Sequence, residues 1–116
     1  MKKMNISIKG YGENTATFGT QGLVCVSQPV KMTGNLTVGP CEAGDDFAGV
    51  AVNVRNEYAG VQLAGFVTVD YSGTAPVPGY CWLTADGKGG VSVNENGRKY
   101  LVVTVDTAKS TAGIIL

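Results

Sequence analysis

Alternation of apolar and polar residues is the main pattern along this chain. Apolar side chains recur at every second position in short runs, which is the spacing of a β-strand with one buried face. The clearest runs are Val50, Val52 and Val54; Val61, Leu63, Val67, Val69 and Tyr71; and Leu101, Val103 and Val105. Gly65 interrupts the second run and predicts a bulge or bend there. Ile6 and Ile8, Val24 and Val26, and Val91 and Val93 are shorter strand candidates.

Turn residues separate these runs. Residues 86–90 (Asp-Gly-Lys-Gly-Gly) and 94–98 (Asn-Glu-Asn-Gly-Arg) are rich in residue types that accept a positive φ. They predict an antiparallel meander from about residue 80 to 105. Pro76, Pro78 and Gly79 form a stiff connection in front of it. For residues 106–111, a single helical turn and a loop before a last strand at 113–116 are equal alternatives.

No window of ten residues shows helical spacing with caps, and no segment between strands is suited to a crossover helix. Val is much more frequent than Leu, and β-branched residues favour strands. The chain is therefore predicted to be all-β, a small antiparallel β-barrel or sandwich with a flexible N-terminal arm. We assign residues 1–20, which are polar and glycine-rich, to the arm, and residues 21–116 to a single β domain. A first strand over 4–9, paired inside the domain, is an equal alternative.

The composition argues against most chemistry. Histidine is absent, which removes the usual general base and the commonest transition-metal ligand. The carboxylates form no recognisable pair or calcium loop, and the three cysteines lack paired zinc spacing. We therefore expect no enzyme, no catalytic residue, no metal and no cofactor. Buried free thiols are the expected state of Cys25, Cys41 and Cys81, and a single disulfide between two of them, which the sequence does not assign, is the alternative.

The net charge and the first residues of the chain limit the kinds of partner that the sequence predicts. Nine basic and nine acidic residues cancel, and no basic stripe is present for nucleic acid or a membrane surface. Neither a signal peptide nor a membrane span is recognisable, so synthesis in the cytoplasm is expected.

Tyr80, Trp82 and Tyr100 are candidate recognition residues, as a stacking platform for a sugar or nucleic acid. Tyr80 and Trp82 share one parity, so they are expected on one strand face. Packing in the core is the favoured alternative for Trp82, because the single tryptophan of a small protein usually lies there.

A family resemblance rests on two stretches. The first is Pro-Cys-Glu-Ala-Gly-Asp-Asp-Phe-Ala-Gly-Val at 40–50, and the second is Gly-Tyr-Cys-Trp-Leu-Thr-Ala-Asp-Gly-Lys-Gly-Gly-Val at 79–91, followed by a Val-rich strand. In the order of these segments and in its residue composition, the chain from 40 to 116 resembles bacteriophage head decoration proteins, also called capsid cement proteins. Its three cysteines depart from that pattern.

The resemblance implies a virion structural protein, made in the host cytoplasm, that sits on the capsid exterior and stabilises the head. It implies the major capsid protein as partner and a homo-trimer at symmetric subunit junctions. The candidate capsid-contact residues of the arm are Met4, Ile6, Ile8, Tyr11 and Phe18. A carbohydrate- or receptor-binding β module of a phage tail or cell surface is the alternative function.

Overall fold

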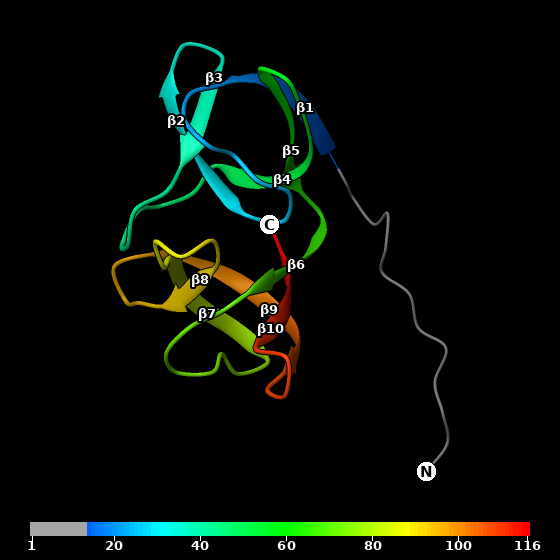
Figure 1. Ribbon diagram of the computed structural model, residues 1–116. Coiled ribbons are helices and arrows are strands. Elements are labelled where there is room, and N and C mark those ends of the chain that lie inside the picture. The colour runs from blue at the N-terminus through cyan, green and yellow to red at the C-terminus, as the bar shows by residue number, and fades with distance from the viewer. Residues whose placement is uncertain (1–13) are drawn as a thin grey trace, which may run out of the picture.

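The computed structural model describes residues 14–116, which form ten β-strands in two sheets and contain no helix (Figure 1). The all-β prediction is confirmed. The strands are β1 (Asn14–Thr20), β2 (Pro29–Gly34), β3 (Thr37–Pro40), β4 (Gly49–Arg55), β5 (Tyr58–Ala64), β6 (Phe66–Asp70), β7 (Gly79–Ala85), β8 (Val91–Val93), β9 (Arg98–Asp106) and β10 (Thr111–Ile115).

The first sheet is a closed barrel in the order β1-β3-β2-β4-β5. Its strands pair antiparallel except β1 and β3, which pair in parallel. Small and β-branched side chains fill the barrel, as suits a narrow interior. Its core consists of Val24, Val30, Val38, Ala51, Ala59 and Val61.

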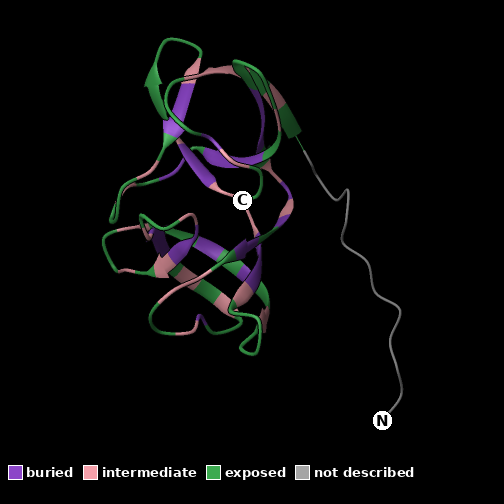
Figure 2. Cartoon of the chain, viewed as in Figure 1, coloured by how far each residue is buried: buried purple, intermediate pink, exposed green. Residues whose placement is uncertain are grey.

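The second sheet has five strands in the order β6-β10-β9-β7-β8, and every strand pair in it is antiparallel. It has a separate core, visible as buried segments below the barrel in Figure 2. That core consists of Phe47, Val50, Val67, Val69, Leu83, Ala85, Val91, Tyr100, Val102, Ala112 and Ile114. Two separate cores were not predicted from the sequence.

Gly65 is where the chain leaves the barrel for the second sheet. It separates β5 from β6 and has a φ of 91°, a left-handed conformation that favours glycine. Val61 belongs to the barrel core and Val67 to the second core. The bend predicted at Gly65 is confirmed, and the long apolar run of the sequence is two strands.

The loop between β3 and β4 joins the two sheets. Phe47 stacks on Tyr100 with ring centroids 5.1 Å apart. The backbone N–H of Gly44 donates to the carbonyl oxygen of Ala85 (2.9 Å), and the N–H of Ala85 donates to the carbonyl oxygen of Asp45 (2.8 Å). The loop therefore continues the hydrogen bonding of β7.

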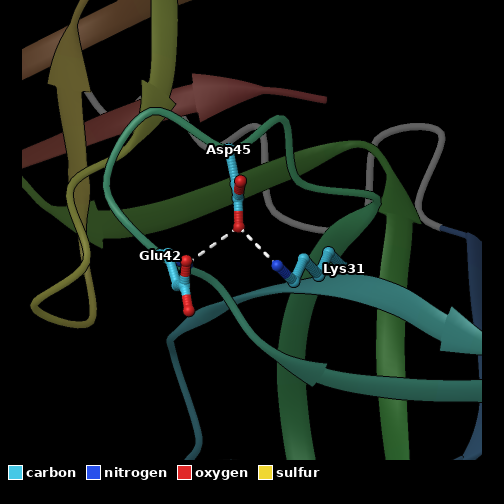
Figure 3. A network of polar contacts seen from close by, with 3 residues as sticks. All are labelled: Lys31, Glu42 and Asp45. Atoms are coloured by element: carbon cyan, nitrogen blue, oxygen red, sulfur yellow. Dashed lines mark hydrogen bonds and ion pairs between the residues drawn. The ribbon is translucent and has the colours of Figure 1, made fainter.

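A polar network fixes the same loop (Figure 3). Asp45 Oδ2 accepts hydrogen bonds from Lys31 Nζ (2.6 Å) and from the backbone N–H of Glu42 (2.9 Å). The Lys31 hydrogen bond, followed by that of Glu42, lowers the pKa of Asp45, and Asp45 raises the pKa of Lys31. These residues hold the loop against β2, so their role is structural.

One of the two predicted turns is a hairpin. Residues 86–90 connect the paired strands β7 and β8, and Asp86 Oδ1 accepts from the N–H groups of Lys88 (2.6 Å) and Gly90 (2.9 Å). Residues 94–97 also form a turn, but β9 pairs with β7 and not with β8. The predicted meander is wrong at this step, because long-range pairing and not the turn selects the neighbour of β9.

Two β-bulges change which residues face the cores. The register of β4 against β5 shifts between Ala51 and Asn53, and Val52 is exposed there. In β9 the shift lies opposite Gly113 and Ile114; Val102 is buried, whereas Leu101 and Val103 are exposed. Strict alternation fails at these points because a bulge inserts one extra residue into one strand.

Candidate interaction surface

Trp82 is exposed, so its predicted place in the core is wrong. It retains 45% of its accessible surface and Tyr80 retains 75%, whereas Leu83 on the other face of β7 is fully buried. Leu83, Tyr100 and Val102 already fill the second core from β7 and β9. The predicted shared face of Tyr80 and Trp82 is therefore the outer face of the sheet.

The strand registers place further apolar residues beside Tyr80. Directly opposed residues of neighbouring strands point to the same side of a sheet. Tyr80 pairs with Leu101, Leu101 with Ile115, and Ile115 with Phe66. These four residues form a row across β7, β9, β10 and β6. We call the row, together with Trp82 and the exposed Val103, the outer face.

Sequence reasoning missed Phe66, Leu101 and Ile115 as members of this surface. Lys99 has the same parity as Leu101 on β9, ahead of the bulge. A lysine rarely points into a core. This parity was the available signal that Leu101 faces outward.

Lys99 lies at one end of the outer face. It is the register partner of Trp82, and its Nζ lies 4.9 Å from the centroid of the Trp82 ring. An ammonium group over an indole is a favourable cation–π contact. Lys99 therefore adds a positive charge at the tryptophan end of the face.

Acidic residues lie at the other end. Asp106 pairs with Thr111, and Thr111 pairs with Asp70, so both carboxylates share a row across β9, β10 and β6. Asp106 Oδ1 accepts hydrogen bonds from the N–H groups of Ala108 (3.0 Å) and Lys109 (3.2 Å). These bonds order the β9–β10 turn and leave the second carboxylate oxygen free of any hydrogen bond within the described residues.

Between the two ends the Phe66 ring covers the backbone at Gly113. Gly113 pairs with Thr104 and Thr68, and a Cβ on Gly113 would lie 2.6 Å from the Phe66 ring. Glycine is required because the Phe66 ring occupies the space of a side chain at this position.

The predicted arm falls partly within the described residues. Residues 14–20 form β1, which pairs antiparallel with β5. Phe18 is partly buried and packs against the barrel core. Met4, Ile6, Ile8 and Tyr11 lie outside the described residues, as does the alternative strand over 4–9.

All three cysteines are free thiols, as predicted, but they are only partly buried. Burial raises the pKa of Cys41 to about 11. A thiol with so high a pKa is a poor nucleophile at neutral pH, because the thiolate is the reactive form.

Two hollows lie away from the outer face. One, of about 180 Å³, lies where the barrel meets the 86–90 turn and is lined by Gln28, Pro29, Pro40, Cys41, Ala85 and residues 87–90. A shallow one of about 540 Å³ lies on the outside of the barrel and is lined by Thr17, Asn53, Val54, Arg55, Tyr58 and Gly60. Neither brings two carboxylates together.

Within residues 14–116, no group of three or more His, Cys, Asp or Glu side chains is placed to hold a metal ion. That part of the chain also has no helix long and apolar enough to cross a membrane. No protein-family model matches the chain, and no curated protein sequence matches it. Within residues 14–116, the outer face is the candidate interaction surface.

Proposed function

We propose that this protein is a virion structural protein that decorates the outside of a bacteriophage head and stabilises it. The work is done by contacts between protein surfaces. Two observations support this function. Residues 40–116 resemble decoration proteins, and the outer face exposes apolar and aromatic residues.

The exposed apolar face is the observation that carries this proposal. Aromatic residues are enriched in protein–protein contacts, and Trp and Tyr dominate their energetic hot spots. Tyr80 and Trp82 lie side by side on a rigid strand, next to Leu101 in the register. A face of this composition is suited to contact with another protein surface.

The two stretches that carry the resemblance contact each other. Gly44 and Asp45 of the first stretch hydrogen-bond to Ala85 of the second, and the backbone at Ala43 packs against Gly87. Together they build the joint between barrel and sheet. A clamp between capsid subunits would need such contacts to hold its two sheets together.

We assign the shell contact to Met4, Ile6, Ile8 and Tyr11, whose backbone would add to an edge strand of the major capsid protein. Three copies around each local three-fold position of the shell are the arrangement that goes with this role. Symmetry then multiplies weak contacts.

Co-sedimentation tests the proposal. The purified chain is mixed with expanded heads, prepared without it, of the phage that encodes it. We expect it to sediment with the heads and to raise the temperature at which filled heads release DNA. The variant with Ile6→Glu and Ile8→Glu should lose binding, whereas Lys2→Glu with Lys3→Glu, the matched control, should retain it. Failure of the unmodified chain to bind expanded heads contradicts the proposal.

Glycan binding is the second candidate function, and the exposure of Trp82 favours it. Sugars stack their apolar faces on exposed aromatic rings, and Tyr80 and Trp82 offer two on one face. Titration with a panel of soluble bacterial-surface glycans, read out by Trp82 fluorescence, tests it. Saturable quenching that Tyr80→Ser weakens supports this function, and unchanged fluorescence across the panel excludes those glycans.

A further inference from the structure

The outer face has opposite charges at its two ends. Lys99 lies in the row of Trp82, whereas Asp70 and Asp106 lie in the row beyond Thr104. The apolar row of Tyr80 and Leu101 lies between them. Lys99 and Asp106 are separated by six residues of β9, one of which is the extra residue of the bulge, so they lie roughly 20 Å apart along the strand. Lys99 and Asp106 of one chain are too far apart to neutralise each other across water.

We propose that the outer face pairs with the outer face of a second copy of this chain. The two copies are related by a two-fold axis that lies between their facing outer faces and runs perpendicular to the strands. In this arrangement the facing strands run in opposite directions. The Lys99 end of one copy then meets the Asp106 end of the other, twice. The proposal rests on the proposed function only in treating this face as a protein contact, and it needs no capsid.

Charge selects the direction of the axis. An axis parallel to the strands would place Lys99 against Lys99 and the acidic rows against each other, which costs free energy. With the axis across the strands, Lys99 of each copy instead faces the acidic row of the other copy, and the two contacts are attractive. A two-fold interface must be self-complementary, and a patch with opposite charges on either side of an apolar centre meets that condition.

The pairing also explains the apolar side chains. Sheets that pack face to face keep their strands roughly aligned and interlock their inner side chains. Tyr80, 75% exposed in the single chain, would enter such a layer. The Phe66 ring, which covers Gly113, would enter the same layer.

The first test is the mass of the full-length chain in solution, measured by sedimentation velocity and light scattering over a range of concentrations. We expect a reversible dimer of twice the 12.0 kDa of the single chain. Tyr80→Ser should weaken dimerisation by at least about tenfold, as for hot-spot tyrosines. Tyr58→Ser is the matched control, because Tyr58 is also an exposed strand tyrosine, 60% exposed, but lies on the barrel. It should leave the dimer unchanged.

The second test identifies the contact across the axis. Lys99→Glu should weaken the dimer by placing two like charges against Asp106 of the second copy. Adding Asp106→Asn to it should restore part of the affinity, although Asp106→Asn alone should weaken the dimer. Asparagine keeps the Oδ1 acceptor that orders the β9–β10 turn. Circular dichroism confirms that each variant is folded.

The outcomes are distinct. A monomer at every concentration, a trimer in solution, or equal effects of Tyr80→Ser and Tyr58→Ser would overturn the pairing. The pairing would also be overturned if the effects of Lys99→Glu and Asp106→Asn on the affinity of the dimer were purely additive. Capsid binding without dimerisation would refute this inference but not the proposed function. A dimer that does not bind capsids would refute the proposed function but not this inference.

Discussion

Replacing Phe47 with alanine tests whether the β3–β4 loop joins the barrel to the second sheet. Phe47 is 3% exposed and its ring stacks on Tyr100. Truncating a buried phenylalanine costs about 3–5 kcal/mol, because the apolar contact is lost and a cavity remains. The hydrogen bonds of Gly44 and Asp45 to Ala85 limit how far the loop can collapse into the cavity. We therefore expect a loss of about 3–4 kcal/mol.

Urea unfolding followed by circular dichroism measures this loss. A protein of this size has a total stability of about 5–15 kcal/mol, so the variant should unfold at a much lower urea concentration. Phe47→Leu keeps most of the apolar volume and should lose less than half as much. Phe18→Ala, at the partly exposed barrel wall, is the second comparison. A loss below about 1 kcal/mol for Phe47→Ala would refute the joint as described.

Three further predictions follow from single residues. Gly97→Ala should lower stability by about 1–3 kcal/mol, because its Cβ would collide with the carbonyl of Leu83, whereas Gly34→Ala, whose nearest neighbour is 3.9 Å away, should change it by less than about 0.5 kcal/mol; thermal unfolding compares them. The Asp45–Lys31 pair should stabilise the fold above the unfolded pKa of Asp45, about 3.9, and lose this contribution as pH falls through the lowered folded pKa; an acid titration of Asp45→Asn should lack that step, and an identical profile would contradict it. Alkylation of Cys41 by iodoacetamide, followed by mass spectrometry, should stay slow at pH 8 and accelerate toward pH 11; fast labelling at pH 8 would show that the thiol is not shielded.

Local chemistry in the sequence was sufficient for the turns and the bend. Residues 86–90 form the predicted hairpin because Asp86 binds the backbone of its own turn and glycines supply the positive φ at 87 and 89. Gly65 breaks the strand run for the same kind of reason. Such features need no knowledge of distant residues.

Features that depend on contacts between distant parts of the chain could not be predicted from the sequence. The pairing of β9 with β7 depends on which edge is free after the chain folds back, and turn residues do not encode that choice. The bulge in β9 reverses the parity of its apolar residues, so Leu101 faces outward although Val105 still packs against the core. For Tyr80 and Trp82 the shared face was predictable, but its direction was not, because apolar residues occupy both faces of β7.

Apolar residues on both faces of a strand are themselves informative. Antiparallel sheets with one solvated side usually carry polar residues there, whereas strands covered on both sides are apolar throughout. The barrel departs from the first rule at Val52, Tyr58 and Leu63, which are exposed on its strands, although the polar Thr17, Asn53 and Arg55 are exposed there too. The second sheet departs from it at Tyr80 and Leu101, which oppose each other outside a core already filled by Leu83 and Val102. What sets the second sheet apart is the register of its outward apolar residues, which oppose one another in one row across four strands, and this is the row that the proposed pairing would cover.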